Sequence, residues 1–279
     1  MVFLRRIARH CILTCAALLL AFGTKAHAQP WPTLTLMVVP QFPATVLYST
    51  WGKLVVNMDG VHIKMVFAKD IDDFEERFMR GEADLIYCNP YHMVMAKQSQ
   101  GYLPLLRDAK PLTGILLAPA KGQPGHVSSL EELQGKTMLF PSPNAFGASL
   151  YMRALLTEQR GLQFSTQYVK THPNVIRGVV RSEGAAGGMV AATFLSESEE
   201  LRSKVQVLYE TPPTASHPLA VHPRVPEQLR KHIQAQVLAH LRDDPATAAS
   251  VQMSHPMLAD YKRDYQPLET LGLEKYVSR

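Results

Sequence analysis

The chain has 279 residues, with 29 Lys and Arg against 24 Asp and Glu, which gives a formal net charge of +5 at pH 7. Residues 1–28 contain Arg5, Arg6, Arg9 and Lys25 and no acidic residue, so the rest of the chain holds 25 basic against 24 acidic residues. Such a nearly neutral remainder, without any block rich in Lys or Arg, argues against nucleic acid or another polyanion as the partner.

The first 28 residues have the pattern of a secretory signal peptide. The arginines precede an apolar run from Ile12 to Phe22 that is too short to span a bilayer by itself. The segment Ala26-His27-Ala28 matches a small-x-small cleavage site, so we expect the mature chain to begin at Gln29. Two alternatives stay open, namely lipid attachment at Cys15 and a membrane anchor that is not removed.

Cysteine content is informative once the signal peptide is set aside. Cys11 and Cys15 belong to residues 1–28, so Cys88 is the only cysteine of the predicted mature chain. Oxidising compartments favour disulfides, but a single cysteine has no internal partner. A leftover cysteine in a secreted protein is therefore a candidate for a specific role.

Strand and helix patterns alternate through the first part of the chain. Phe74 and Phe78 lie one helical turn apart and Gly81 follows as a stop signal, which predicts a helix over 70–80. The alternation of apolar and polar residues over 62–67 predicts a strand. The expected elements are strands at 34–39, 62–67, 83–88 and 102–106, and helices at 48–58, 70–80 and 91–98.

The same alternation continues in the second part. Ser128 followed by Glu131 fits a capping box, so we expect a short helix over 128–133. Leu229, Ile233 and Val237 form an apolar stripe on a long amphipathic helix over 226–241. The other expected elements are strands at 113–118, 136–140, 166–169, 205–209 and 219–222, and helices at 145–159 and 174–181.

This order of elements predicts an α/β protein with mostly parallel sheets covered on both faces. The strand–helix–strand pattern occurs twice, which indicates two similar α/β lobes. We expect the chain to cross to the second lobe near 111–113 and to return near 211–213. The expected domains are therefore 1–28 as signal peptide, 29–112 with 211–279 as lobe 1, and 113–210 as lobe 2, with a hinge and a cleft between the lobes that closes on a ligand.

Three segments together resemble the phosphate, phosphite and phosphonate-binding family of periplasmic solute-binding proteins. The segment 81–92, Gly-Glu-Ala-Asp-Leu-Ile-Tyr-Cys-Asn-Pro-Tyr-His, is similar to that family's strand-to-helix corner. The segment 129–136, Ser-Leu-Glu-Glu-Leu-Gln-Gly-Lys, and the segment 171–175, Thr-His-Pro-Asn-Val, follow in the family's order. The resemblance covers about residues 34–240.

The resemblance implies a periplasmic binding protein-like fold of type 2, a periplasmic location, and a small-molecule ligand for an ABC permease or the ectodomain of a sensor histidine kinase. It implies no enzyme activity, no cofactor and no metal, and we expect a monomer. In the family the ligand lies in the interlobe cleft at helix N-termini, where backbone N–H groups suit an anion. Carried over by position, the ligand-binding residues are Tyr87, Cys88, Asn89, Tyr91, His92, Asn144, Ala145, Phe146, Gly147 and His172, with Ala148 next to them.

The sequence departs from the family at the start of the second-lobe helix. Ala145, Phe146 and Gly147 stand where the phosphonate binders have Ser-Thr-Ser, so the hydroxyl donors to a phosphoryl group are missing. Cys88 stands in the binding corner where the family has Leu. Both features are similar to the arsenite-sensing relatives of the family, in which case Cys88 would bond arsenite directly, because thiolates select thiophilic elements.

Three functions therefore stay open. The first is capture of a small oxyanion or an arsenite-like ligand for transport or sensing. The second is uptake of phosphonate or phosphate through a diverged site. The third, a thiol enzyme that uses Cys88 with His172 as base, has no supporting G-x-S-x-G, H-E-x-x-H, P-loop or C-x-x-C motif.

Overall fold

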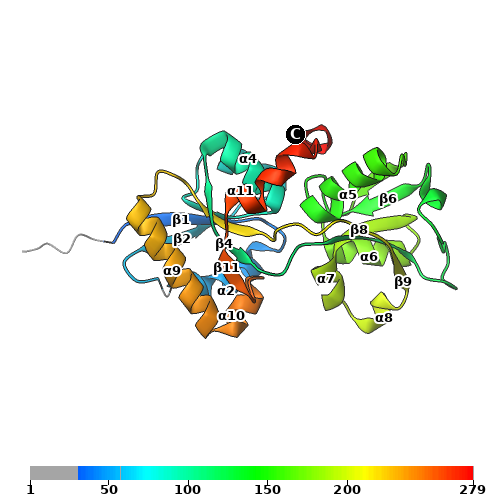
Figure 1. Ribbon diagram of the computed structural model, residues 1–279. Helices are drawn as coiled ribbons and strands as arrows, with labels where there is room; N and C mark the ends of the chain where they lie inside the picture. The colour runs from blue at the N-terminus through cyan, green and yellow to red at the C-terminus, as the bar shows by residue number, and fades with distance from the viewer. Residues whose placement is uncertain (1–30, 57, 279) are drawn as a thin grey trace, which may run out of the picture. The chain divides into compact units, whose positions relative to one another are not determined.

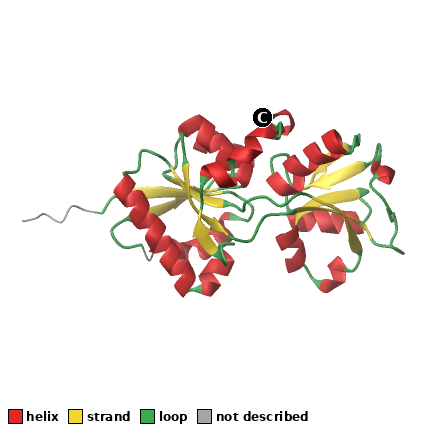
Figure 2. Ribbon diagram, viewed as in Figure 1, coloured by secondary structure: helices red, strands yellow, loops and turns green. Residues whose placement is uncertain are grey.

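The computed structural model describes residues 31–278 with the exception of residue 57, and the predicted signal peptide lies outside this range. Residues from Thr33 onwards form one compact unit. Its strands belong to two sheets, each flanked by helices (Figures 1 and 2). None of the helices in the described part is both long enough and apolar enough to cross a membrane. The expected α/β class is confirmed.

The first sheet has six strands in the order β11-β4-β10-β3-β1-β2. Strands β2 and β3 run parallel to β1, whereas β10 is antiparallel to β3 and β4, and β11 is antiparallel to β4. The prediction of a mostly parallel sheet is therefore wrong, because the chain that returns from the second sheet enters between β3 and β4 in the opposite direction. The strands are β1 (Thr33–Val38), β2 (His62–Val66), β3 (Leu85–Tyr87), β4 (Leu103–Asp108), β10 (Pro218–Val221) and β11 (Pro256–Leu258).

The second sheet has five strands in the order β7-β6-β8-β5-β9. Strand β6 is parallel to β7 and β8, and β5 is antiparallel to β8 and β9. Two apolar clusters cover its opposite faces, one with Met152 and Leu156 and one with Val175 and Val179. The strands are β5 (Gly114–Pro119), β6 (Thr137–Phe140), β7 (Ser165–Tyr168), β8 (Ala186–Val190) and β9 (Val205–Glu210).

Helices pack on both sides of the first sheet. Figure 1 shows α9 and α10 on one side and α4 with α11 on the other. In α3, Asp70 caps the first turn by accepting from the Asp73 N–H, and the rings of Phe74 and Phe78 lie 5.2 Å apart in the core. The helices are α2 (Ala44–Val56), α3 (Ile71–Met79), α4 (Pro90–Gln100), α9 (Glu227–Asp243), α10 (Pro245–Ser250), α11 (Tyr261–Asp264), η4 (Gln266–Thr270) and η5 (Leu273–Tyr276).

The second sheet is covered by a segmented helix on one face and by α6, α7 and α8 on the other (Figure 1). The segmented helix begins after a Pro141–Pro143 turn, and its first and last segments have wide π-type turns. Its parts are η2 (Phe146–Leu150), α5 (Tyr151–Ala154) and η3 (Leu155–Gln159). The others are η1 (Glu131–Leu133), α6 (His172–Val180), α7 (Ala191–Ser196) and α8 (Glu199–Arg202).

One local prediction is wrong, and one strand was missed. The capped helix expected over 128–133 is a single 3₁₀ turn at 131–133, and no side chain caps it. The Ser128 hydroxyl lies 3.1 Å from His126 Nε2 instead, which removes it from the capping position. Strand β8 was not expected, because its Ala-Gly-Gly-Met-Val sequence has two glycines and only one of the β-branched residues typical of strands. A Cβ at Gly188 would lie well inside van der Waals contact with the Ala148 carbonyl, so the close approach of η2 requires glycine there.

The two sheets are linked by the segments 109–113 and 211–217. These segments pair with each other through the Leu112 and Thr214 backbones, with N···O distances of 2.9 and 3.0 Å. The C-terminal segment packs on the first sheet through buried Leu273 and then contacts the second-sheet helix. There, Arg153 donates to the Tyr276 carbonyl over 2.7 Å, and Ser278 donates to Asn144 over 3.0 Å.

Candidate ligand-binding site

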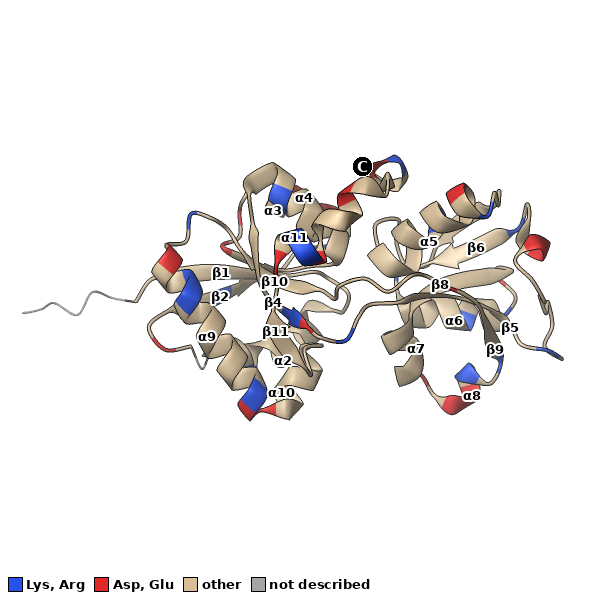
Figure 3. Ribbon diagram, in the orientation of Figure 1, with Lys and Arg blue, Asp and Glu red and all other residues tan. Residues whose placement is uncertain are grey.

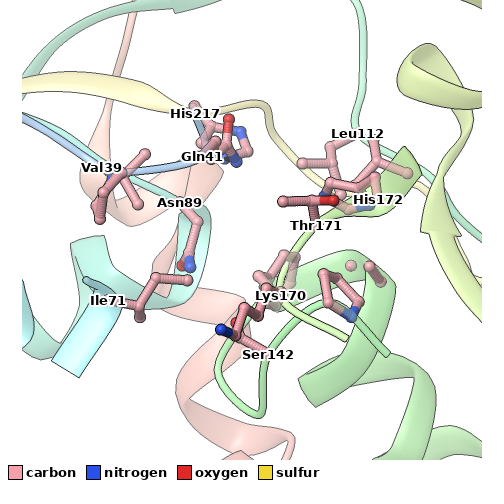
Figure 4. A pocket seen from close by; sticks show the side chains of 17 residues that line it. Val39, Gln41, Ile71, Asn89, Leu112, Ser142, Lys170, Thr171, His172 and His217 are labelled. Atoms are coloured by element: carbon pink, nitrogen blue, oxygen red, sulfur yellow. Dashed lines mark hydrogen bonds between the residues drawn. The ribbon is translucent and has the colours of Figure 1, made fainter. Parts of the chain in front are cut away.

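A cavity of about 40 Å³ lies between the two sheets. Figure 4 shows Gln41, Asn89 and His217 on one side of it and Thr171 and His172 on the other. Its walls therefore come from segments that are far apart in the sequence. The lining residues are Val39, Pro40, Gln41, Ile71, Asn89, Leu112, Pro141, Ser142, Ala145, Phe146, Gly147, Ala148, Lys170, Thr171, His172, Val190 and His217.

The first turn of η2 lines this cavity. The N–H groups of Ser149 and Leu150 both donate to the Ala145 carbonyl, and these are the first hydrogen bonds of the helix. Phe146, Gly147 and Ala148 lie between Ala145 and Ser149 and therefore form the first turn. First-turn amides have no partner within a helix and carry its positive dipole end. All three of these residues line the cavity, which gives it the character of an anion site.

Two buried polar side-chain atoms in the cavity lining have no hydrogen-bond partner. They are Nδ1 of His172 and Oγ of Ser142. A buried polar group without a hydrogen-bond partner destabilises the folded protein by about 1–3 kcal/mol. A ligand that bonds to both atoms removes this penalty, which favours its binding. Burial lowers the pKa of His172 from 6.5 to about 4, so the imidazole is neutral at pH 7 and one ring nitrogen is a donor and the other an acceptor.

A second neutral imidazole faces the first across the cavity. Burial, with smaller contributions from His92 and His172, lowers the pKa of His217 from 6.5 to about 3. Its Nε2 lies 3.0 Å from Gln41 Nε2, and its ring stacks on Tyr87 at 5.7 Å. The position of this ring is therefore fixed from two sides.

Lys170 is the only residue with a formal charge at pH 7 among those that line the cavity. It is exposed and has φ 75, a left-handed conformation that is uncommon for residues other than glycine. Elsewhere the charges are interspersed, as Figure 3 shows along α8 and α9. Lys204 and Glu200 pair there at 2.7 Å, and Lys231 and Glu227 at 2.6 Å. A lining with one cation and no carboxylate favours an anionic ligand.

Buried hydrogen bonds join the two sheets directly behind the cavity. Glu75 of α3 accepts from Asn144 over 3.0 Å and lies 2.8 Å from Nε2 of His92. Asn89 caps α4 by accepting from the His92 N–H and donates to the Asn144 carbonyl over 3.2 Å. His92 and Asn144 thus hold the walls in place and are not among the residues that line the cavity.

The remaining predicted residues lie in different places. Cys88 has no exposed surface and does not line the cavity, and burial raises the pKa of its thiol. Tyr91 is buried and also does not line it. Tyr87 lines a neighbouring cavity of about 180 Å³ instead. The structure therefore brings together five of the predicted residues, namely Asn89, Ala145, Phe146, Gly147 and His172.

Five polar residues of the lining were missed. Ser142, Lys170 and Thr171 lie within two positions of the predicted site residues Asn144 and His172, so a slightly longer segment at each place would have included them. Strands β1 and β3 are parallel neighbours, with Val38 opposite Tyr87. Gln41 and Asn89 therefore follow the same edge of the sheet, and pairing these two strands from the sequence would have pointed to Gln41. His217 precedes a strand that enters the sheet antiparallel, and nothing in the sequence indicates that direction. No group of three or more His, Cys, Asp or Glu side chains suited to a metal occurs among the residues that the structure describes.

Two β-sheets covered by helices and joined by paired connecting segments, with a cavity between them, define the class of periplasmic solute-binding proteins of type 2. The model of the ABC transporter phosphonate periplasmic substrate-binding proteins matches residues 36–265. The chain belongs to this family. A search of curated proteins found no match.

Solved structures of the same fold are distant in sequence. PhnD1 from Prochlorococcus marinus in complex with methylphosphonate has a TM-score of 0.75 at 15% identity, over 87% of this chain and 98% of that one. XAC2383 from Xanthomonas citri bound to chloride has a TM-score of 0.72 at 14% identity, over 88% and 99%. The binding protein component of a phosphonate transporter from Pseudomonas aeruginosa has 0.69 at 14%, over 88% and 87%.

Proposed function

We propose that this chain captures a small oxyanion in the cavity between the two sheets and delivers it to an ABC permease. One observation carries the proposal: the unpartnered, buried Nδ1 of His172 and Oγ of Ser142 share a cavity with the first-turn N–H groups of η2. These groups replace the hydroxyl donors that Ala145, Phe146 and Gly147 lack. Lys170 supplies the single positive charge.

The proposal includes the division of the chain into lobes. Residues 29–112 with 211–279 form one lobe and 113–210 the other, and the segments 109–113 and 211–217 act as the hinge. The hydrogen bonds of Glu75 and Asn89 to Asn144 would then belong to the closed state. Residues 1–28 direct the chain to the periplasm and are removed, and the mature protein works as a monomer.

An arsenite-sensing role with a histidine kinase partner is the competing assignment, and it depends on Cys88. The thiol is enclosed by the core, and its raised pKa disfavours the thiolate that bonds thiophilic elements. The geometry therefore supports the oxyanion more strongly. The same burial weighs against a thiol enzyme, since the thiolate is the nucleophile.

Calorimetric titration of the mature protein with phosphate, methylphosphonate and arsenite tests the proposal. We expect phosphate or methylphosphonate to bind, and His172→Ala to weaken that binding at least tenfold, because a hydrogen bond to a charged group contributes about 1.5–3 kcal/mol. Cys88→Ala is the matched control and should change the dissociation constant by less than about twofold, because Cys88 lies outside the lining.

Two results would contradict the proposal. One is that neither phosphate nor methylphosphonate binds to the folded wild-type protein. The other is that arsenite alone binds and that Cys88→Ala abolishes its binding, which would establish the arsenite assignment instead.

A further inference from the structure

The C-terminal segment joins the first sheet to the helix that covers the second sheet. Its base is anchored by Tyr265 and Leu273, which are fully buried, and the Tyr265 hydroxyl donates to the Ser216 carbonyl of the connecting segment over 2.9 Å. Beyond this base, η5 contacts α5 on the second sheet. Residues 273–278 therefore cross from one sheet to the other, and we call them the strap.

Asn144, which lies just before η2, uses its whole side-chain amide to bind the strap and α3. Its Oδ1 accepts from the Ser278 N–H over 3.0 Å, and its Nδ2 donates to the Ser278 carbonyl over 3.0 Å. The other Nδ2 hydrogen goes to Glu75 Oε2, also over 3.0 Å, so both donors of the amide are used. Because Asn144 is buried, moving the two sheets apart would break all three bonds and leave the amide without these partners.

Arg153 of α5 is the second attachment point of the strap. Its Nη2 donates to the Tyr276 carbonyl over 2.7 Å and to the Pro143 carbonyl over 2.8 Å. The guanidinium carbon lies 5.9 Å from the ring centres of both Tyr168 and Tyr276, a distance at which a cation attracts an aromatic face. One guanidinium thus ties the strap to the turn that precedes η2.

That turn, residues 141–145, is also a wall of the cavity. Ser142 and Ala145 line the cavity, whereas the two residues between them, Pro143 and Asn144, take part in the hydrogen bonds just described. Adjacent residues of one tight turn move together. The cavity therefore cannot widen on this side unless the bonds of the strap break.

We propose that the strap locks the cavity in its closed state, so that release of the strap sets how fast a bound oxyanion leaves. This inference rests on the proposed function, because it takes an oxyanion to bind in the cavity. It concerns the rate of ligand exchange and not the identity of the ligand. Asn144 and Arg153 are then positioning residues, which act on the ligand only through the turn between them and the cavity.

Ser278→Pro tests the strap without changing any residue that lines the cavity. Proline has no N–H, so the variant loses the bond to Asn144 Oδ1. Val277 has φ −69 and ψ 125, which suits a residue before proline. We expect the dissociation rate of methylphosphonate, measured by phosphorus NMR exchange, to rise about fivefold, which is the usual net contribution of one hydrogen bond. Ser278→Ala is the matched control and should stay within about twofold, because Ser278 is exposed and keeps its backbone groups.

Arg153→Met removes the second attachment point. We expect its dissociation rate to rise at least tenfold, because hydrogen bonds from a charged donor are stronger than neutral ones. Lys275→Met is the matched control within the strap. The Lys275 ammonium lies 3.8 Å from Glu158 in an exposed pair, and such pairs contribute little, so this variant should stay within about twofold of the wild type.

A second readout separates locking from a general effect on folding. Coupling between two sites is reciprocal, so if the strap slows ligand release, the ligand must also stabilise the attached strap. Methylphosphonate should therefore slow amide hydrogen exchange of residues 276–278 in the wild-type protein.

The possible results separate the strap from the proposed function. Unchanged dissociation rates in Ser278→Pro and Arg153→Met, or strap amides whose exchange methylphosphonate does not slow, would overturn the strap and leave oxyanion capture intact. Absence of binding of both methylphosphonate and phosphate to the folded wild-type protein would overturn the proposed function and the strap with it.

Discussion

Replacing Gly114 by alanine is expected to lower the free energy of unfolding by about 3 kcal/mol and to weaken oxyanion binding at least tenfold. A Cβ at Gly114 would lie well inside van der Waals contact with the Gly147 carbonyl and 3.1 Å from Thr211 Cγ2. Overpacking of this kind typically costs about 1–3 kcal/mol. The first contact is backbone and cannot rotate away, so η2 must shift, and η2 carries the first-turn donors of the cavity.

Denaturant unfolding followed by titration with methylphosphonate measures both effects. Gly52→Ala is the matched control, because Gly52 lies inside α2 with no atom within 4 Å of the added Cβ. Alanine in a helix interior is favoured over glycine by about 1 kcal/mol, so this variant should be as stable as the wild type or more so. A Gly114→Ala protein with wild-type stability and affinity would refute the close packing of β5 against η2.

Lowering the pH from 7 to about 4.5 is expected to destabilise the protein by roughly 3 kcal/mol through His217 alone. The folded-state pKa of about 3 lies below the ordinary value of 6.5, so between these values the unfolded chain binds more protons than the folded one. The contribution of neutral His217 to the free energy of unfolding is therefore fully present above about pH 6.5. It decreases by about 1.4 kcal/mol for each pH unit below that value. His172, whose pKa is lowered to about 4, acts in the same direction over about pH 6.5 to 4.

Urea unfolding of the wild type and of His217→Gln at both pH values isolates this contribution. Carboxylates that are protonated in acid affect both proteins alike. The variant should lose stability at pH 7, where its contacts with Gln41 and Tyr87 are altered, but should lose less than the wild type on acidification. Parallel pH profiles for the two proteins would show that His217 is not kept neutral by its surroundings.

Local sequence patterns predicted the elements that depend on local interactions. The α3 helix was expected from Phe74, Phe78 and Gly81, and its cap, its buried face and its end at a glycine with φ 70 all follow from neighbours along the chain. The start of α6 at His172 could also be predicted from the local sequence. The α/β class followed from the order of such elements, and the family assignment followed from three segments read together.

Features that depend on contacts between distant segments were not predictable in the same way. Strand β8 owes its form to the close approach of η2 to Gly188, and no strand propensity signals it. The direction of β10 is set by where the chain returns, so the contribution of His217 to the cavity was missed. Cys88 was predicted to bind the ligand because it lies in the strand-to-helix corner, but its side chain is buried in the core.

The most direct test is a crystal structure of the mature protein grown with methylphosphonate. The account predicts the phosphonate oxygens within hydrogen-bond distance of the Phe146, Gly147 or Ala148 N–H groups and of His172 Nδ1. Clear density for the ligand at any other location, with the cavity between the sheets holding only solvent, would contradict it.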